Sequence, residues 1–434
     1  MSWQKTKISE FLTERKDRFK PDKANELGLP RIEKIDFSGT IYINNFKPTK
    51  TGMILVKNGD LVISGINVEK GALAIYKGAT DALATIHYSS YTYDENRIDI
   101  DYLKWYLQSN IFRNILKEQV KGGIKTEIKP KTFLNLEIML PDLTTQKKIA
   151  SKLNKLEWNV KDLDFTCFCN KELIDKLRQS ILQEAIQGKL VPQNPNDEPA
   201  SALLKKIKAE KEQLIKAGKI KKEKYIILDN NLEIVIPKNW CMCVVQDISL
   251  KVTDGEHLTP QRANSGYFLL SARNITNQGL KLDNVDYVDE REFNRIRKRC
   301  NPNKSDILIS CSGSVGRVCL ADKDNCYVMV RSVAMVRPHK NIYPEYLVYA
   351  LKSDFLQKQI EKSSKITAQA NLFLGKILEL QIPLPPTEEQ KRIVTRVDEL
   401  MKLCDKLGNE NNNAQKASSE LLQAIMQKYF TPEV

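Results

Sequence analysis

The feature that most constrains the fold of this chain is a repeat at about half its length of 434 residues. The segment PLPPTEEQKRIV, 383–394, nearly restates LPDLTTQKKIA, 140–150. Adding 244 to each residue number places 140–150 on 384–394. The same shift places the whole of 102–186 on 346–430 without a gap. Further upstream, 58–76 resembles 304–322 only weakly and after a small change of shift. The chain is therefore predicted to contain two halves that share a framework toward their C-terminal ends and differ at their beginnings.

The C-terminal part of each half carries the period of a coiled-coil seam. Apolar or small residues recur at alternating steps of four and three, at Ile149, Leu153, Leu156, Val160, Leu163, Cys167, Ile174, Leu177 and Ile181. The second copy runs through Ile393, Val397, Leu400, Cys404, Leu407, Asn411, Ala414, Ser418, Leu421 and Ile425. A helix from about residue 146 to 186 would be roughly 60 Å long. Such a helix needs a partner, because its apolar seam would otherwise face water.

Both seams weaken near their middle, where Asn170 and Asn411 stand. A buried polar residue in a seam lowers stability and fixes the alignment of the two helices. A solvated defect in the middle of a helix explains the same residues equally well. The sequence leaves both interpretations open.

The repeated motif is interpreted as a helix start. Pro385 and Pro386 end the preceding strand, and Thr387 is expected to accept a hydrogen bond from the first turn, with Gln390 completing a capping box. In the first copy Leu143 stands in the place of the threonine, so capping must fall to Asp142 or Thr144. We therefore expect the weaker cap in the first copy.

The segment between the halves is interpreted as a linker. Its prolines break regular structure, and Leu203, Leu204, Ile207, Leu214 and Ile215 then mark a short amphipathic helix. The lysine-rich end of the linker, 219–224, is interpreted either as a phosphate contact or, preferably, as a solvated connection. Outside the long helices, alternating apolar segments bounded by turn residues predict strands, and the segments 102–116 and 346–360 predict helices.

Charge points to an anionic partner. The chain has 68 Lys and Arg against 54 Asp and Glu, a net charge of +14, for which nucleic acid is the leading candidate partner and a merely basic, soluble surface is the alternative. The N-terminus lacks the apolar segment of a secretory signal, and no run of about 18 apolar residues occurs. We therefore expect a cytoplasmic protein.

The residues that catalysis or metal binding would require are missing. Nine cysteines occur without a C-x-x-C pair, and the three histidines do not stand near a cysteine pair at zinc spacing, so we expect reduced structural thiols and no metal. The chain has neither a phosphate-binding loop nor a dinucleotide-binding turn, and it lacks the Asn-Pro-Pro-aromatic and Asp-Pro-Pro-aromatic tetrapeptides of amino-methyltransferases. GSVG, 313–316, is interpreted as a turn between strands. We expect a non-catalytic chain that binds no cofactor itself.

The order of these parts resembles the specificity subunit of type I restriction-modification systems. The resemblance rests on LPPTEEQKRIVTRVDELMKLCDKL, 384–407, and on LRQSILQEAIQGKLVPQNPNDEPASALL, 177–204. It rests also on IPKNWCMCVVQDI, which opens the second half, and on ILISCSGSVGRVCL within it. The likeness covers nearly the whole chain and is weakest at the beginning, where WQKTKISEFL lacks the Pro-x-x-Trp lead that Pro237 and Trp240 supply in the second half.

The resemblance implies an α+β fold in which two mixed α/β target-recognition domains are separated by two long antiparallel coiled-coil helices, with a pseudo-two-fold internal repeat. The expected parts are a first target-recognition domain at 1–142, a first spacer helix at 143–190, a linker at 191–235, a second target-recognition domain at 236–386, and a second spacer helix with the C-terminus at 387–434. Each target-recognition domain is expected to read one half of an asymmetric bipartite site in double-stranded DNA.

The resemblance also implies partner proteins. Two modification subunits, which bind S-adenosylmethionine and methylate adenine, are expected to dock on the helices and the adjoining domains. Restriction subunits that use ATP and Mg²⁺ to translocate and cleave DNA are expected to join that complex. None of this chemistry is expected in the present chain.

Residues that contact DNA are expected among basic and amide side chains, which bind phosphates and base edges. In the first domain the candidates are Arg15, Lys16, Arg18, Lys20, Lys121, Lys125, Lys129 and Lys131. In the second domain they are Arg262, Arg273, Arg295, Arg297, Lys298, Arg299, Lys365, Gln369 and Asn371. For each of them a solvated surface charge is the competing interpretation.

Two other classes of function compete with DNA recognition. An enzyme that acts alone on DNA is disfavoured by the missing motifs. A coiled-coil interaction scaffold without specific DNA binding is disfavoured by the net charge and by the two unlike folded domains. Gel-shift assays distinguish the scaffold from a DNA-recognition protein, because a scaffold would bind no duplex sequence in preference to another.

Overall fold

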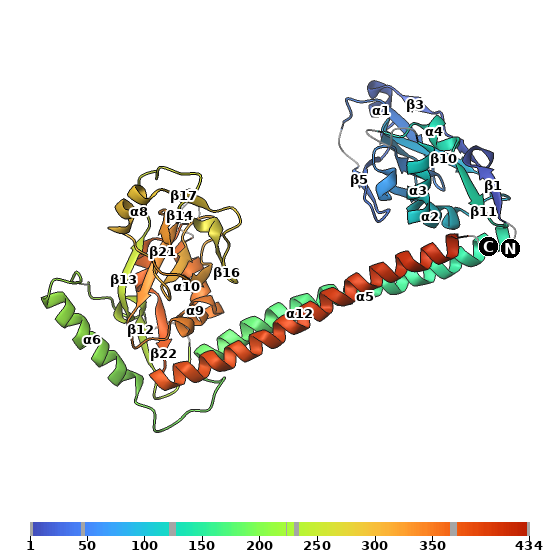
Figure 1. The fold of residues 1–434 in the computed structure, drawn as a ribbon. Helices are drawn as coiled ribbons and strands as arrows, with labels where there is room; N and C mark the ends of the chain where they lie inside the picture. The colour runs from blue at the N-terminus through green and yellow to red at the C-terminus, as the bar shows by residue number, and fades with distance from the viewer. Residues whose placement is uncertain are drawn as a thin grey trace. The chain divides into compact units, whose positions relative to one another are not determined.

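The computed structural model describes residues 3–44, 48–120, 127–222, 224–229, 234–364 and 371–431. They divide into two compact units, the first formed by Met1–Cys169 with Glu410–Val434 and the second by Asn170–Asn409. Two 44-residue helices, α5 (Leu143–Ile186) and α12 (Thr387–Phe430), contribute one part to each unit (Figure 1). Each unit therefore consists of a folded domain and a segment of each long helix.

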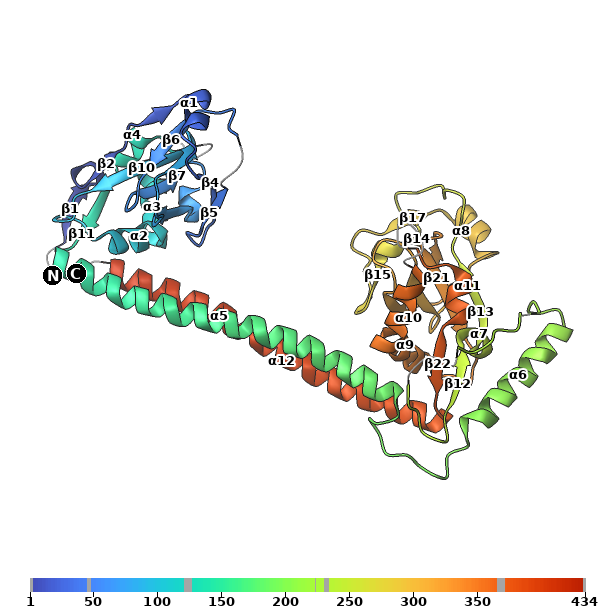
Figure 2. The ribbon, with the colours of Figure 1, turned by 180° about the vertical axis from the view of Figure 1, so that it is seen from behind.

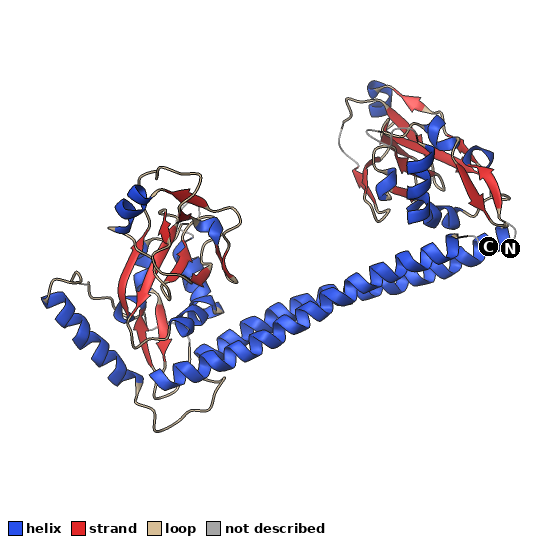
Figure 3. Cartoon of the chain, in the orientation of Figure 1, coloured by secondary structure: helices blue, strands red, loops and turns tan. Residues whose placement is uncertain are grey.

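Over its described residues, the domain of the first unit mixes short helices with three sheets, and Figure 3 shows the helices in blue and the strands in red. Its helices are η1 (Ile8–Glu10), α1 (Pro21–Glu26), η2 (Val68–Lys70), α2 (Ile100–Gln108), α3 (Asn110–Gln119) and α4 (Pro130–Leu134). Its strands are β1 (Gln4–Lys7), β2 (Leu12–Glu14), β3 (Arg18–Phe19), β4 (Arg31–Ile35), β5 (Ile41–Asn44), β6 (Met53–Val56), β7 (Leu61–Ser64), β8 (Leu73–Ile75), β9 (Ala82–Thr85), β10 (Tyr88–Tyr93) and β11 (Glu137–Leu140).

The domain of the second unit is preceded by α6 (Ala200–Lys216), drawn in green in Figure 2. Leu203 and Ile207 of α6 are buried in the core of that unit. Its other helices are α7 (Val245–Ile248), η3 (Ala272–Asn274), α8 (Glu290–Arg297), α9 (Pro344–Lys352), α10 (Asp354–Ser364) and α11 (Leu374–Glu379). Its strands are β12 (Cys241–Val244), β13 (Ser249–Asp254), β14 (Tyr267–Leu270), β15 (Ile275–Thr276), β16 (Gly279–Leu280), β17 (Asp286–Val288), β18 (Ile307–Ser310), β19 (Val318–Leu320), β20 (Tyr327–Met329), β21 (Val333–Pro338) and β22 (Gln381–Leu384).

The two domains share a strand order that extends beyond the sequence repeat. The sheet β2-β10-β7-β8 of the first matches β13-β21-β18-β19 of the second, and the pair β1-β11 matches β12-β22. In each domain one strand has a parallel neighbour on one side and an antiparallel neighbour on the other: β4 lies between β9 and β5, and β14 lies between β20 and β17. The mixed α/β fold class with long helices and an internal repeat is confirmed.

The long helices pair antiparallel within each unit. In the first unit Ile149 and Leu153 of α5 share a core with Met426 and Phe430 of α12. In the second unit Arg178 of α5 forms an ion pair of 2.6 Å with Asp405 of α12. Within the first unit, Cys167, farther along α5, contacts Asn411, farther back along α12, so the two helix segments run antiparallel. The predicted period is present, although Leu177 and Leu421 stay 45% and 59% exposed because two helices leave much of each seam uncovered.

At one position of this pair a residue meets its own repeat equivalent. The Asn411 side-chain amide donates to the Cys167 carbonyl oxygen at 2.8 Å, and the Cys167 thiol donates to the Asn411 carbonyl oxygen at 3.7 Å, across a sequence separation of 244. An antiparallel pair of equivalent helices has one such self-equivalent crossing. Of the two interpretations of the polar seam residues, alignment therefore fits Asn411, whereas Asn170 is exposed.

The repeated glutamine fastens each long helix to its domain. The Gln146 side chain accepts a hydrogen bond from Asp99 N at 2.8 Å and donates to Pro141 O at 2.9 Å. The Gln390 side chain accepts from Tyr343 N at 2.9 Å and donates to Pro385 O at 3.0 Å. Every partner is shifted by 244 residues, and both glutamines are buried. The motif is thus a junction between domain and helix.

Two predictions about the helix starts are wrong. Thr387 is already the first residue of α12, so the capping position before the helix is Pro386, whose side chain has no hydrogen-bond acceptor. The Gln390 side chain accepts a hydrogen bond from Tyr343 N and does not complete a capping box. In the first copy Asp142 is the cap, accepting from Thr145 N at 2.9 Å and from Thr145 Oγ1 at 2.8 Å. The stronger side-chain cap is therefore in the first copy and not in the second.

The segments predicted as single helices are each two helices. Ser109 ends α2 and caps α3, donating to Tyr106 O at 2.6 Å and accepting from Phe112 N at 3.2 Å. Ser353 makes the equivalent bonds to Ala350 O and Leu356 N between α9 and α10. The serine hydroxyl competes with the backbone ladder, which favours a break at this position.

Candidate nucleic-acid interface

In the first domain three segments meet at the connection between β9 and β10. Gly65 N, which follows β7, donates to His87 O at 2.9 Å, and Ile128 N donates to Gly65 O at 2.9 Å. We call residues 65, 86–87 and 128 the first loop cluster. Ile86 is 51% exposed on it, and the His87 ring lies 3.6 Å from the Glu127 carboxylate.

The second domain repeats this arrangement at the connection between β20 and β21. Cys311 N donates to Ser332 O at 2.8 Å, and Leu372 N donates to Cys311 O at 2.9 Å. We call residues 311, 331–332 and 372 the second loop cluster. The backbone bonds match those of the first cluster, but Arg331 and Ser332 take the places of Ile86 and His87. The framework is shared and the exposed side chains differ.

Predicted site residues of the second domain gather around this cluster. Arg262 Nε and an Arg273 terminal nitrogen lie 3.3 Å and 2.9 Å from the same Asp286 oxygen. Ala272, next to Arg273, donates its backbone N–H to Ser332 Oγ at 3.1 Å. One carboxylate balances two largely exposed guanidinium groups, so a positive charge remains at this edge of the domain.

Arg295 and Arg299 are balanced by acidic neighbours. Arg295 contacts Glu292 at 2.8 Å and Glu256 at 3.0 Å, and these two carboxylates raise the pKa of its guanidinium. Arg299 contacts Asp254 and lies 3.1 Å from His257 Nε2. Their pairing leaves little net charge for a phosphate, although both side chains are more than 40% exposed.

The remaining predicted residues of the second domain divide into three groups. Arg297 donates to the carbonyl oxygens of Pro302 and Tyr327 at 3.3 Å each and lies over the Phe293 ring, and burial lowers the pKa of its guanidinium. We therefore assign Arg297 a structural role. Lys298 is exposed, and Asn371 forms an isolated bridge with Ser312 beside the second loop cluster. Lys365 and Gln369 lie outside the described residues.

In the first domain Arg15 is committed to an internal ion pair. Its guanidinium binds Asp60 through two bonds of 2.7 Å and 2.8 Å, and the hydrogen bond to that carboxylate raises the pKa of Arg15. The Asp60 side chain is 4% exposed, so the arginine neutralises a charge that would otherwise be buried alone. A structural role explains Arg15.

The other predicted residues of the first domain are exposed where the structure describes them. They are Lys16, Arg18, Lys20, Lys129 and Lys131, whereas Lys121 and Lys125 lie outside the described residues. Lys20 directly precedes α1 and follows Phe19 in the chain. Gly52 lies between the Phe19 carbonyl and the Ile86 side chain. Lys129 precedes α4 and follows Ile128. These two lysines therefore flank the first loop cluster.

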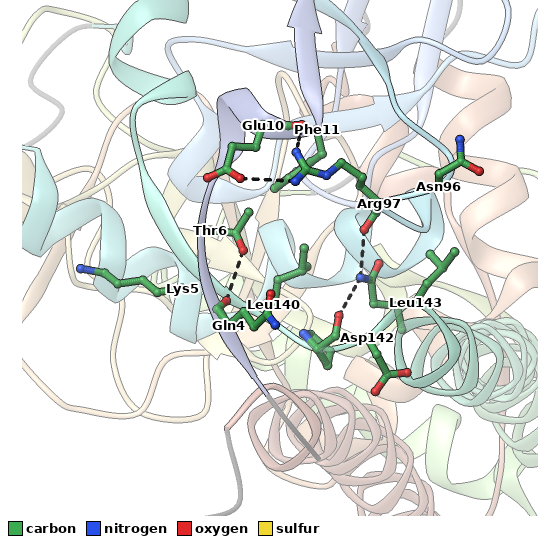
Figure 4. Close-up of a pocket in the computed structure, with 12 residues that line it drawn as sticks. Gln4, Lys5, Thr6, Glu10, Phe11, Asn96, Arg97, Leu140, Asp142 and Leu143 are labelled. Atoms are coloured by element: carbon green, nitrogen blue, oxygen red, sulfur yellow. Dashed lines mark hydrogen bonds and ion pairs between the residues drawn. The ribbon is translucent and has the colours of Figure 1, made fainter.

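A polar pocket of about 360 Å³ lies elsewhere, at the start of α5 (Figure 4). Its wall includes Arg97, which donates to Glu10 O at 2.8 Å and lies 3.7 Å from the Glu10 carboxylate. Lys5, also in the wall, forms an ion pair of 2.6 Å with Glu137. Because its basic groups are paired and Asp142 adds a negative charge, this pocket is a poor site for a phosphate.

The described residues contain no group of three or more His, Cys, Asp and Glu that could hold a metal ion. Burial raises the pKa of the Cys243 and Cys311 thiols, which disfavours the thiolate. Within the described ranges no helix is both long and apolar enough to cross a membrane.

Sequence reasoning missed Arg331 and Ile86. Neither belongs to a basic cluster or a motif, and the two residues do not align at the shift of 244. Their equivalence is visible only in the backbone bonds of the two loop clusters. The signal that could have found them is their place directly between two apolar strands that precede the repeated helices.

Comparison with known proteins gives a consistent result. Residues 250–416 match the family model described as "Type I restriction modification DNA specificity domain". The Type I restriction enzyme EcoEI specificity subunit of Escherichia coli is 29% identical over 67% of this chain and 50% of its own length. The EcoAI specificity subunit of Escherichia coli is 27% identical over 92% of this chain and 76% of its own length. The chain thus spans about half the length of the first relative and three quarters of the second.

Two solved structures share the fold across the whole chain. One, from a study of "complex assembly and conformational transition of the type I R-M system", has a TM-score of 0.66 at 16% identity and covers 100% of this chain and 98% of the other. The HsdS subunit from Thermoanaerobacter tengcongensis has a TM-score of 0.53 at 17% identity and covers 100% of this chain and 97% of the other. At these identities the likeness establishes the fold alone.

Proposed function

We propose, from the premise that this chain belongs to the family of type I restriction-modification specificity subunits, that it recognises DNA sequence for such a system. Each domain reads one half of an asymmetric bipartite site in double-stranded DNA. The observation that carries this proposal is the pair of loop clusters, in which matching backbone bonds present unlike side chains. Two copies of one framework with different exposed residues suit two different half-sites.

The long helices set the spacer between the half-sites and dock the modification subunits. A helix of 44 residues is about 66 Å long at about 1.5 Å per residue, which exceeds the roughly 34 Å of one duplex turn. The α5 side chains of Trp158, Phe165 and Phe168 are 70%, 67% and 58% exposed. Exposed aromatic side chains of this kind are typical of surfaces that bind another protein.

The proposed role is non-catalytic. S-adenosylmethionine then binds to the modification subunits, and ATP with Mg²⁺ binds to the restriction subunits. A location in the cytoplasm follows from a substrate that is chromosomal DNA. Among the candidates, Arg262, Arg273 and the lysines flanking the first loop cluster supply phosphate contacts, because they lie beside the loop clusters and the two arginines share a single carboxylate, Asp286.

The experiment that tests the proposal maps methylated adenine in a host that expresses this chain together with its modification subunit. We expect one bipartite motif, with two unlike half-sites and a fixed spacer, that disappears when the gene for this chain is deleted. Methylation that persists after the deletion, or that lacks a sequence motif, would contradict the proposal.

The two competing functions predict different results. An enzyme acting alone would methylate or cleave DNA as a purified chain without partner subunits. A coiled-coil scaffold would show no preference among duplexes in a gel shift, even with modification subunits present. The scaffold is not favoured, because the relatives and the family model are those of specificity subunits.

A further inference from the structure

We infer that Arg331 recognises a guanine base in the half-site that the second domain binds. This inference rests on the proposed function and deepens it, since it names the residue and the class of base. Arg331 lies in the second loop cluster, between β20 and β21, and its side chain is exposed. A guanidinium group binds guanine O6 and N7 through two parallel hydrogen bonds in the major groove.

The backbone around Arg331 is fixed on several sides. Arg331 N donates to Glu256 O at 3.0 Å, and Val330 N donates to Leu270 O at 3.0 Å. Ser332 O accepts from Cys311 N at 2.8 Å, and Ser332 Oγ accepts from Ala272 N at 3.1 Å. An exposed side chain on a backbone held by neighbouring segments can be positioned accurately, which base recognition requires.

The surrounding charges leave Arg331 available to a ligand. Asp286 is engaged by Arg262 and Arg273, Glu256 is engaged by Arg295, and Asp254 is engaged by Arg299. In the part of the chain that the structure describes, Arg331 has no ion-pair partner. The neighbouring Arg262 and Arg273 carry an uncompensated charge that can bind the phosphates beside the base that Arg331 reads.

The first domain supplies the internal comparison. Its loop cluster presents Ile86 where the second presents Arg331, on a backbone with the same hydrogen bonds. An apolar side chain at a base edge contacts the thymine methyl group, whereas an arginine selects guanine. A difference at this one position is therefore sufficient to give the two half-sites different bases.

The test uses the full chain in complex with its modification subunit and reads the methylated motif. Arg331→Gln should lower the preference for guanine at one position of one half-site by about 5- to 150-fold, and should shift the preference toward adenine, which glutamine binds. The other half-site should stay unchanged. Arg331→Lys should keep guanine, because lysine also donates to O6 and N7. Arg291→Gln, on an exposed α8 side chain of the same domain that is not a candidate contact, is the matched control and should leave the motif unchanged.

Each remaining outcome decides against the inference. If Arg331→Gln methylates the same motif as the wild-type protein, the inference is wrong and the proposed function is unaffected. Equal weakening on all duplexes, with a salt slope smaller by about 0.9, would identify a phosphate contact instead. If Arg331→Gln abolishes methylation altogether, a loss of the guanine preference in Arg331→Lys overturns the inference. A wild-type chain without a bipartite motif overturns both proposals.

Discussion

At the scale of single residues, the repeat is most faithful in its hydrogen bonds. Trp105 donates to Asn154 at 2.7 Å, and the equivalent pair, a shift of 244 residues later, is Tyr349 donating to Asp398. Both members of the pair have changed while the bond between domain and long helix is retained. The sequence identified Gln146 and Gln390 as equivalent but not their role, because a capping box is a local pattern and the true acceptor bond comes from 47 residues away.

The first prediction concerns the junction glutamine of the first unit. Gln146→Leu removes the acceptor of Asp99 N and the donor to Pro141 O, leaving a part-buried N–H and a buried carbonyl without these partners. Each stranded group costs about 1–3 kcal/mol, so the free energy of unfolding of this unit should fall by that order. Urea unfolding, together with hydrogen exchange at the Asp99 amide, measures the effect.

The matched control for that prediction is Gln423→Leu in the same unit. The Gln423 side-chain oxygen is buried without a hydrogen-bond partner among the described residues. Its replacement removes an unsatisfied acceptor and should leave stability unchanged or slightly raised. If both variants lose the same stability, the junction role of Gln146 is wrong.

The second prediction concerns pH and His339. Burial lowers the pKa of this imidazole below its ordinary value, against the raising effect of Glu210, whose carboxylate lies 3.3 Å from Nε2, while Lys340 and Lys211 act in the lowering direction. As pH falls below about 6.5, the unfolded chain binds a proton that the folded chain still refuses. Stability that is fully present above that pH should therefore be lost as the pH falls toward 5.

His339→Asn isolates this contribution because asparagine does not titrate. We expect the difference in unfolding midpoint between wild type and variant to shrink as pH falls from 8 to 5, since other groups titrate alike in both. Thermal unfolding at several pH values gives the measurement. A difference that stays constant over this range would show that His339 titrates at the same pH in the folded and unfolded chain.

At the scale of elements, the period of the seam predicted both long helices, but the contacts at their starts could not be deduced from it. Helix starts depend on which groups of the adjoining domain reach them. Pro385 and Pro386 restrict the backbone before α12, whereas Asp142 binds the first turn of α5 directly. The same junction is therefore stabilised differently in the two copies.

The third prediction follows from this difference between the caps. Asp142→Ala should lower the denaturant midpoint of the first unit, because the first turn of α5 loses its side-chain acceptor. Thr387→Ala should change the second unit by less than about 0.5 kcal/mol, because Thr387 is inside the helix and does not cap it. Denaturant unfolding of the two variants gives both values. The reverse order of effects would restore the capping-box interpretation.

The fourth prediction concerns the helices as a spacer. Seven residues inserted in each helix, after Cys169 and after Asn409, preserve the seven-residue seam and add about 10 Å to each helix. We expect a longer spacer in the methylated motif, by at most about three base pairs at roughly 3.4 Å each, with both half-sites unchanged. Altered half-sites with an unchanged spacer would count against the spacer role. Insertion in one helix alone shifts the register at Asn411 and is the control that should abolish methylation.

At the scale of the whole molecule, the repeat predicted two related halves, but it could not reveal how far the relation extends. The strand order is shared where the residues are not, because backbone bonds such as those of Gly65 and Cys311 do not depend on side-chain identity. The candidate site was predicted least well. Basic residues were chosen by charge, yet Arg15 and Arg297 serve internal contacts that depend on residues distant in sequence.

The last prediction is an exchange of the first domain. Replacing residues 1–142 by the corresponding domain of a relative should change one half of the methylated motif and leave the other half and the spacer as they were. The exchanged domain must still receive the end of α12, since Phe430 packs edge-on against Tyr102 and Tyr106 at 5.4 Å and 5.3 Å between ring centroids. A donor domain with aromatic residues at both positions should therefore give a stable protein, whereas one with small residues there should need its own α12 terminus as well.

The reciprocal exchange decides whether the domains act independently. Replacing residues 236–386 should change only the other half of the motif. The donor domain must then pack against Ile186 of α5, which is the repeat equivalent of Phe430 and lies in the core of the second unit. Each half-site thus depends on one domain, while the stability of that domain depends on the helix end supplied by the other half of the chain. A change in both half-sites after either exchange, measured on a variant with a wild-type unfolding midpoint, would show that the domains do not read independently.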